Sequence, residues 1–215
     1  MTQLEIARNL LMERKKEMRN MKPNHKFHDE DTYSHSISVV QHSSKLAYQL
    51  DLSDDAEEQL RTACYAHDLG KVETWNPEGS PWFRGHEEVS ADILVANGFD
   101  PDDDIVNAVR YHGRLQQFDK MSDKARHKLV KKISNLKLFI MLQLCDAEGF
   151  SVYGRTQALK QLKEFVDFVC DNVVFNVFGD ETYPVWLQIV IDEILPADMT
   201  DAFGTPNAFG DNNDD

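Results

Sequence analysis

The feature that most constrains the fold is a pair of ionisable residues, His67 and Asp68, at the end of an apolar run. The pair follows Cys64-Tyr65-Ala66 and precedes Leu69-Gly70-Lys71. Burying adjacent ionisable side chains at a helix end costs free energy unless other groups compensate their charge. A divalent metal ion would compensate both, because neutral imidazole and carboxylate are common metal ligands. The pair therefore predicts a metal site inside a folded core.

Apolar residues recur at helical spacing along most of the chain. A capping box of Thr2 and Glu5 opens a first helix, which we expect to end near Asn20. Other start and stop signals predict helices from Thr32 or Ser34, from Ser53 or Asp54 to Gly70, from His86 to Gly98, from Pro101 to His112, and over about 123–148, 155–175 and 183–195. Alternating strand patterns and hairpin turns are scarce. The predicted fold is all-α, a compact bundle of about seven or eight helices.

The domain boundaries follow from where this pattern stops. We expect one helical domain over residues 1–195, with an irregular loop at 72–85 where Pro and Gly are frequent. Residues 173–175 are assigned to a helix, although Val-Val-Phe is also compatible with a strand. Residues 196–215 are rich in Gly, Pro, Asn and Asp and predict a flexible acidic tail.

The charge of the chain narrows the class of ligand. A formal net charge of −14 argues against strong binding to a nucleic-acid polymer, because phosphate contacts need clustered Lys and Arg. Binding of a small anion by a metal ion and a few nearby cations is compatible with this negative net charge. Residues 120–137 depart from the acidic trend, with Lys120, Lys124, Arg126, Lys128, Lys131, Lys132 and Lys137 against Asp123. We interpret them as a solvated helix face, with contact to a polyanion or partner as the alternative.

The cysteines and the N-terminus bear on the compartment. Cys64, Cys145 and Cys170 are few and widely spaced, which is typical of reduced, buried thiols in a cytoplasmic protein. Residues 1–8 lack the apolar core of a signal peptide, and no stretch approaches the roughly 20 apolar residues that cross a bilayer. We therefore expect a cytoplasmic protein without membrane association, and the sequence leaves its oligomeric state open.

The rest of the chain supplies further residues of metal-ligand type. His35, His86 and His112 each fall at the beginning or end of a predicted helix, and Asp146 lies in an apolar context where an unpaired carboxylate would be costly. Helices separated by loops can bring such positions together inside a bundle. Any single His is more often an ordinary core or surface residue. The metal site is predicted by the ordered set, together with the pair described above.

This order resembles the HD-domain metal-dependent phosphohydrolases, whose pattern is a His, then His-Asp, then a distant Asp. The matching residues are His35, His67, Asp68 and Asp146. A closer resemblance is to the HD domain of bacterial tRNA nucleotidyltransferases, in which Gly-Lys, a Thr and a Gly-His-Glu follow the pair; the corresponding residues are Gly70-Lys71, Thr74 and Gly85-His86-Glu87. The resemblance covers about residues 30–150. The sequence lacks the nucleotidyltransferase half, so nucleotide addition is not implied.

The resemblance implies an HD-domain-like bundle that cleaves a phosphomonoester or phosphodiester of a nucleotide or similar small anion by a metal-activated hydroxide. It implies a divalent metal cofactor, Fe, Mn, Ni, Co or Mg, and two ions, because family members with two extra His between the pair and the last Asp can hold two. One ion would take His35, His67, Asp68 and Asp146, and the other His86 and His112, with Asp68 bridging. With one ion, the two extra His would instead bind phosphate or relay protons.

Residues near these positions are candidates for contact with substrate. We expect Lys71 to act in catalysis together with Asp68, because a cation there would neutralise charge developing on the phosphate. Tryptophans in the 72–85 loop could stack on a base, or they could anchor the loop on the core. Each Arg could equally form an ordinary surface ion pair. The predicted substrate-binding residues are Lys71, Arg84, Arg110, Arg114, Trp75 and Trp82.

Two other functions stay open at the level of sequence. One is a deoxynucleoside 5′-monophosphatase, a branch of the superfamily that places a Glu three residues after the motif Asp. That position is Lys71 here, with Glu73 two residues further on. The other is a non-catalytic, metal-stabilised module that senses a nucleotide or binds a protein through residues 120–137. The residue that protonates the leaving group is left open among Glu73, Glu87 and His112.

Overall fold

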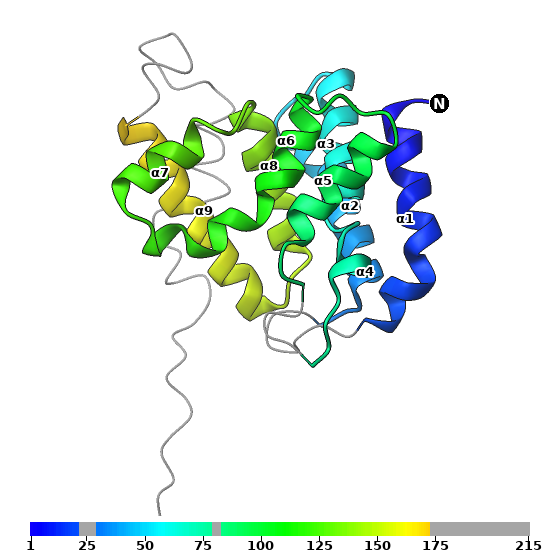
Figure 1. The fold of residues 1–215 in the computed structure, drawn as a ribbon. Helices are drawn as coiled ribbons and strands as arrows, with labels where there is room; N and C mark the ends of the chain where they lie inside the picture. Colours follow the sequence, from blue (N-terminus) through cyan, green and yellow to red (C-terminus); the bar gives the residue numbers. More distant parts are fainter. Residues whose placement is uncertain (22–28, 79–82, 173–215) are drawn as a thin grey trace, which may run out of the picture.

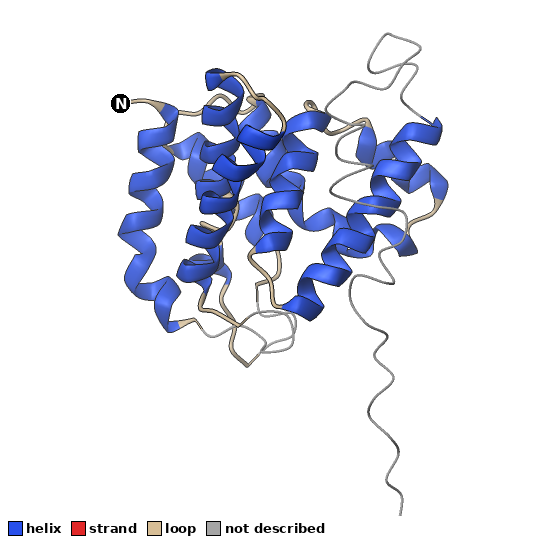
Figure 2. Ribbon diagram, turned by 180° about the vertical axis from the view of Figure 1, so that it is seen from behind, coloured by secondary structure: helices blue, strands red, loops and turns tan. Residues whose placement is uncertain are grey.

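The computed structural model describes residues 1–21, 29–78 and 83–172, which form a bundle of α-helices (Figure 1). In chain order these are α1 (Gln3–Asn20), α2 (Thr32–Gln49), α3 (Asp54–Ala66), α4 (Lys71–Thr74), α5 (His86–Ala96), α6 (Asp104–Tyr111), the 3-10 helix η1 (His112–Lys120), α7 (Asp123–Val130), α8 (Leu136–Glu148) and α9 (Val152–Asn172). The described residues contain no strand (Figure 2). The all-α prediction is confirmed, and eight of these α-helices have eight or more residues.

Several expectations fall outside the described residues. They are the helix at 183–195, the assignment of residues 173–175, the acidic tail at 196–215 and the position of Trp82. No helix of the described part is long and apolar enough to span a membrane. The three cysteines are buried, as the sequence predicted.

Helix α8 forms the centre of the bundle. It packs against α2, α3 and α9, while α1 covers α3 and α5 packs on α6. Its sequence is apolar on nearly every face, as expected for a helix surrounded by others. Phe139 of α8 contacts Phe165 of α9, with ring centroids 5.4 Å apart, and Phe165 in turn contacts Phe118 of η1. The last turn of α8 therefore carries Asp146 into the middle of the molecule.

The helix starts follow local side-chain chemistry, with one correction. Thr2 and Glu5 form the predicted capping box, and Ser53 caps α3. The cap of α2 is Asp31, whose carboxylate accepts a hydrogen bond from the backbone N–H of Ser34 at 2.9 Å. The prediction of Thr32 or Ser34 was therefore wrong by one residue or more, since a carboxylate one position earlier satisfies the same free N–H groups.

The long helix predicted over 123–148 is wrong. The structure divides it into α7 and α8, because polar residues of α6 bind the backbone and side chains between them. Asn107 accepts from the N–H of Ser134 and donates to the carbonyl of Lys132, and Asp104 binds the side chains of Ser134 and Asn135. Asn135 then caps α8. These contacts are long-range, so helical periodicity alone could not reveal them.

Gly70 does not end a helix in the way the sequence suggested. Helix α3 ends at Ala66, and the chain turns through residues 67–70 into α4, so the predicted loop at 72–85 begins with a helical turn. Gly70 has an ordinary φ of −73°, but a Cβ at this position would lie 2.7 Å from the backbone nitrogen of Ser90 and against the carbonyl of His86. The glycine therefore lets the His67-Asp68 turn approach α5.

Replacing Gly70 by Ala should destabilise the protein by about 1–3 kcal/mol, because the added methyl group overlaps backbone atoms that cannot move without shifting α5. Urea unfolding followed by circular dichroism would measure this loss. An unchanged midpoint would show that α5 is free to move away.

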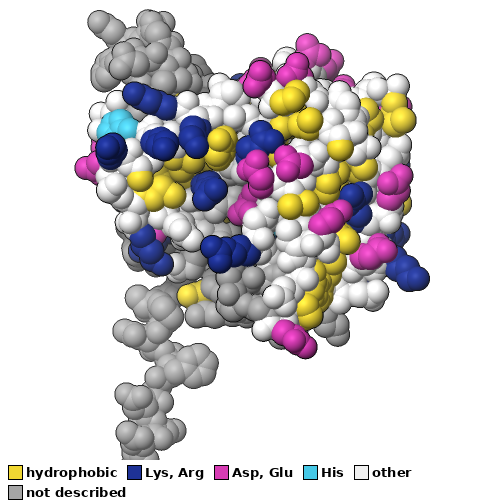
Figure 3. Space-filling view, viewed as in Figure 1, with side chains coloured by type: hydrophobic (Ala, Val, Ile, Leu, Met, Phe, Trp, Pro, Cys, Tyr) yellow, Lys and Arg dark blue, Asp and Glu magenta, His cyan; other side chains and the backbone are white. Residues whose placement is uncertain are grey.

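The basic residues of the 120–137 segment gather on one side of the molecule. Figure 3 shows Lys and Arg side chains over α7 and its neighbours. The exposed ones are Lys120, Lys124, Lys128, Lys131 and Lys132. The interpretation of this segment as a solvated face is consistent with that exposure, and contact with a partner stays a prediction.

Candidate metal centre

The predicted ligand residues converge from the ends of five helices. His35 lies in the first turn of α2, and Asp146 in the last turn of α8. His67 ends α3, with Asp68 next to it. The two extra histidines are His86, the first residue of α5, and His112, which follows the last residue of α6. The structure brings all six together, and all but two of them, Asp146 and His86, are almost fully buried.

Each of the four histidines is held through the same ring atom. Nδ1 lies 2.7–2.9 Å from a backbone carbonyl oxygen: that of Gly149 for His35, Cys64 for His67, Phe83 for His86 and Val109 for His112. A carbonyl oxygen only accepts hydrogen bonds, so Nδ1 is the donor in every case. In a neutral imidazole this leaves the lone pair on Nε2. All four rings are thus fixed in the tautomer that offers Nε2 to a cation.

Asp68 stands between two groups of these nitrogens. Its Oδ2 lies 3.3 Å from Nε2 of His67 and 3.7 Å from that of His35. Its Oδ1 lies 3.3 Å from Nε2 of His86 and 3.7 Å from that of His112. Each oxygen of one carboxylate therefore faces a different pair of histidines.

The donor atoms separate into two trios able to hold a metal ion, within each of which they lie no more than 4.8 Å apart. One trio is His35, His67 and Asp146, and the other is Asp68, His86 and His112. The sequence-based scheme placed Asp68 with the first set and let it bridge. The two trios differ from it only in grouping Asp68 with His86 and His112.

Pairs of acceptor atoms face one another across the cluster, and this arrangement fits a cation. Nε2 of His86 lies 3.2 Å from Nε2 of His112, and Nε2 of His35 lies 3.0 Å from Oδ1 of Asp146. The buried Nε2 of His67 has no hydrogen-bond partner within the described residues. Buried polar atoms are rarely left without a hydrogen-bond partner. A shared proton or a metal ion between these nitrogen and oxygen atoms would satisfy them. Imidazole and carboxylate are ligands that suit a divalent transition metal.

The electrostatics of the cluster favour charged forms. Burial alone would lower the pKa of His67, but the carboxylates of Asp68 and Asp146 outweigh it and raise this pKa to about 10. Burial would raise the pKa of Asp68, yet His67 and the Lys71 ammonium hold it well below its usual range. The pKa of Asp146 is lowered against the effect of burial by the neighbouring rings of His35 and His67. Without a metal ion, His67 therefore holds a proton at neutral pH.

The metal-free protein should lose stability at both ends of the pH scale. The folded pKa of His67, about 10, exceeds its ordinary value of 6.5, so its contribution is complete below about 6.5 and is lost as the pH rises toward 10. Asp68 and Asp146 have lowered pKa values, so their contribution is lost as the pH falls below about 3.8. Chemical denaturation of chelator-treated protein from pH 3 to pH 10 would measure both.

A His67→Gln variant provides the control for that pH profile. It should lack the alkaline loss of unfolding free energy, while His127→Gln, on the distant helix α7, should keep it. An alkaline loss of equal size in the His67→Gln variant would contradict the assignment.

The predicted substrate-binding residues lie in different surroundings. Lys71 is buried, with its Nζ 2.6 Å from Oδ2 of Asp68 and 5.2 Å from the ring centre of Phe83. Trp75 is partly buried and contacts Phe83 edge to face at 5.7 Å. Arg84 and Arg114 are exposed. The structure thus brings Lys71 to the ligand cluster and leaves the two arginines at the surface.

Arg110 points to carboxylates of α5 and not to the cluster. Its guanidinium pairs with Glu88 at 3.0 Å and Asp92 at 3.4 Å. This is the ordinary surface ion pair that the sequence left as the alternative. Of the candidate acids, Glu73 pairs with Arg14, whereas Glu87 lies beside His86, with 3.5 Å between the nearest carboxylate oxygen and ring nitrogen.

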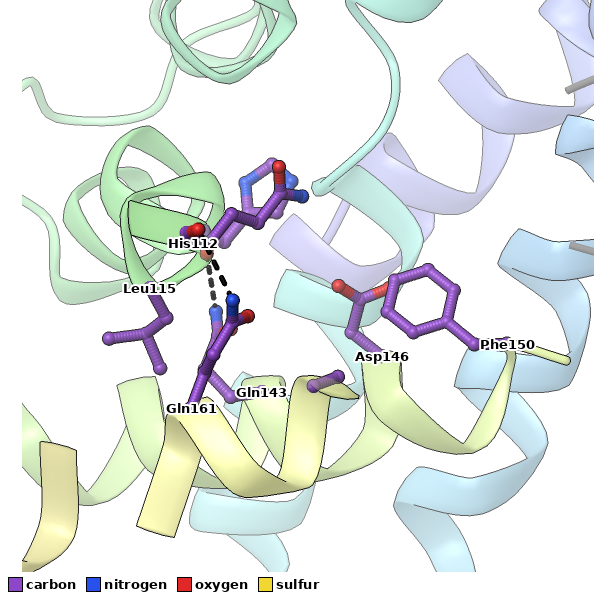
Figure 4. Close-up of a pocket in the computed structure, with 8 residues that line it drawn as sticks. His112, Leu115, Gln143, Asp146, Phe150 and Gln161 are labelled. Carbon is purple, nitrogen blue, oxygen red and sulfur yellow. Dashed lines mark hydrogen bonds between the residues drawn. The ribbon is translucent and has the colours of Figure 1, made fainter. Parts of the chain in front are cut away.

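The sequence did not reveal two glycines that leave room for the ligand histidines and their neighbours. A Cβ at Gly149 would lie 2.6 Å from Nδ1 of His35, and one at Gly113 would overlap the carboxylate of Glu87. Isolated glycines carry no local signal of such contacts. Sequence reasoning also missed a pocket between η1, α8 and α9, which reaches His112 and Asp146 (Figure 4).

Comparison with known proteins places the chain in a family. The family model described as HD domain matches residues 32–142, just over half of the chain. The protein therefore belongs to the HD-domain family, within the metal-dependent phosphohydrolase superfamily. Comparisons with curated proteins and with solved structures gave no significant match.

Proposed function

We propose that this protein is a phosphohydrolase with two divalent metal ions, which cleaves a phosphomonoester or phosphodiester of a small anionic substrate such as a nucleotide. The observation that carries the proposal is the placement of Asp68. Its two oxygens face two separate histidine pairs, and Nδ1 of each of these histidines lies against a backbone carbonyl, so that Nε2 is the ring atom turned toward Asp68. Membership of the HD-domain family supports it.

Each trio of ligand residues would hold one of the two ions, and Asp68 would lie between the two ions. Bound divalent ions would neutralise the phosphate oxygens and lower the pKa of a water molecule. The backbone carbonyls that hold the four Nδ1 atoms keep the imidazoles oriented, a support that typically changes metal affinity or activity about 10–100-fold.

Lys71 has two roles in this scheme. Its ammonium keeps Asp68 ionised at 2.6 Å, and the same charge would offset the negative charge that develops on the phosphate. Glu87, at the edge of the cluster and partly exposed, is the carboxyl group we assign to protonation of the leaving group.

The test is a metal count followed by a substrate panel. Protein loaded separately with Fe, Mn, Ni, Co or Mg would be analysed for bound metal and assayed with p-nitrophenyl phosphate and bis(p-nitrophenyl) phosphate. We expect about two ions per chain and turnover that a chelator abolishes and the metal restores. A count near one would remove His86 and His112 from the ligand set.

Three outcomes separate the remaining functions. Metal binding without hydrolysis of any ester would overturn the proposal in favour of the non-catalytic module. Hydrolysis of deoxynucleoside 5′-monophosphates, with little activity on ribonucleotides, would select the monophosphatase. Hydrolysis of the diester alone would select a phosphodiesterase.

A further inference from the structure

Helix α7 and the turns that flank it carry a group of cations without acidic partners in the described part of the chain. Five lysines make up this basic face, and all are exposed: Lys120, Lys124, Lys128, Lys131 and Lys132. They gather on one side of the molecule (Figure 3). None of the five forms an ion pair with a described residue. Lys132 instead lies over the Tyr111 ring, with Nζ 5.8 Å from the ring centre.

Acidic side chains close to the basic face are few, and some are already paired. Residues 119–135 contain six Lys or Arg against two Asp, which leaves a formal charge of +4. Of the two, Asp123 lies 4.0 Å from Arg126. On the neighbouring helix α9, Asp167 pairs with Lys163 at 2.8 Å. The crowded lysines repel one another, so the face favours an anionic occupant.

The chain itself contains a segment of the opposite charge. Residues 173–215, which lie outside the described part, hold nine Asp or Glu and no Lys or Arg. Five of the nine are aspartates of residues 196–215. An acidic molecule from solution would have to approach a protein with a formal net charge of −14, which repels it over long range. A segment of the same chain is already held nearby.

Helix α9 brings the start of this segment to α7. The Phe168 ring of α9 lies 4.8 Å from the His127 ring of α7 and 5.9 Å from the Arg126 guanidinium carbon. Asn172, the last residue of α9, is one turn further on and donates to the Phe168 carbonyl at 3.0 Å. The acidic segment therefore starts within about one helical turn of α7.

The connection is long enough to reach the whole basic face. Residues 173–195 supply 23 residues of chain, which can extend to about 75 Å, whereas α7 with its eight residues is about 12 Å long. A tethered segment of this kind meets its site at an effective concentration near the millimolar range. Weak contacts are therefore enough to keep the face occupied.

We propose that residues 196–215 bind the basic face of the same chain, with their aspartates paired to its lysines. Single exposed ion pairs are weak, so several must form together, and salt should weaken them. This contact covers the basic face and keeps it from binding nucleic-acid polymers. It does not depend on the proposed catalytic function.

The experiment is carbodiimide cross-linking of the full chain, which joins a lysine amine to a carboxylate in direct contact. A mixture of unlabelled and 15N-labelled protein would be cross-linked, digested with protease Glu-C, which cleaves after Glu193, and analysed by mass spectrometry. We expect links from aspartates of residues 196–215 to the basic face at least about fivefold more often than to Lys45, an exposed lysine of α2. Raising NaCl from about 20 to about 500 mM should reduce these links at least about fivefold.

A pair of double variants tests the lysines. In Lys124→Gln with Lys128→Gln, links to the remaining Lys120 and Lys132 should fall about fivefold, because the segment loses part of its site. Lys16→Gln with Lys45→Gln removes the same charge at exposed positions of α1 and α2 and should leave those links unchanged.

Other occupants of the face would give different results. Links found only between labelled and unlabelled chains would assign the segment to a second copy and overturn the proposal. Links spread evenly over exposed lysines, Lys45 included, would also overturn it. Absence of links at low salt, with retention on heparin that the Lys124→Gln, Lys128→Gln variant loses, would assign the face to a separate polyanion instead.

Discussion

Replacing Asp68 by Asn is expected to abolish turnover and to lower the metal content of the purified protein toward zero. The amide keeps the shape of the carboxylate but removes the charge that faces all four histidines. We expect kcat/KM to fall by more than about a thousandfold, because both ions of the proposed centre lose a ligand. Elemental analysis and the p-nitrophenyl phosphate assay measure the two effects on the same sample.

Two further variants control for misfolding. Asp68→Asn leaves the Lys71 ammonium buried without its partner, at an expected cost of about 3–5 kcal/mol in stability. The double variant Asp68→Asn with Lys71→Met removes both partners and should recover much of that stability while staying without metal. Asp92→Asn, a carboxylate on the exposed surface of α5, should behave as the parent protein. Full activity in Asp68→Asn would refute the proposed centre.

Replacing Gly149 by Ala should damage one half of the ligand cluster selectively. The added Cβ would lie 2.6 Å from Nδ1 of His35 and 2.9 Å from Cγ2 of Val39, so the His35 ring must leave the Gly149 carbonyl. We expect the metal count to fall by about one and activity to fall about 10–100-fold, as for loss of a group that orients a ligand. Stability should fall by about 1–3 kcal/mol.

Gly98→Ala is the matched control for this substitution. Gly98 has a φ of +96°, where a side chain is strained, but its Cβ would meet no atom within 4 Å. The variant should lose about 1 kcal/mol of stability and keep its full metal content. Equal metal loss in Gly98→Ala and Gly149→Ala would mean that general destabilisation, and not the His35 ring, controls metal binding.

The sequence predicted the helical class and the set of converging residues because both leave local signals. Helix caps such as Ser53 and apolar residues at helical spacing need only neighbouring positions to be recognised. The His-Asp pair stood out because ionisable groups in an apolar run demand a compensating charge. Their order along the chain then indicated four helix ends and a single centre.

The features of the fold and of the site that the sequence could not predict depend on contacts between distant segments. The break between α7 and α8 exists because Asp104 and Asn107 of α6 bind residues 132–135. The pairing of Arg110 with α5 and the role of Gly149 likewise involve partners more than fifteen residues away. The two trios follow from which way each oxygen of Asp68 points, and that direction is a property of packing.

The placement of Asp68 between the trios makes the two halves of the proposed centre thermodynamically linked. Each half of the centre would use an oxygen of the same carboxylate, so an ion bound in one half would change the affinity of the other half. By reciprocity, the factor by which the first ion changes the affinity for the second equals the factor by which the second changes the affinity for the first. Metal titrations of the parent protein and of Gly149→Ala, compared with each other, would measure this factor.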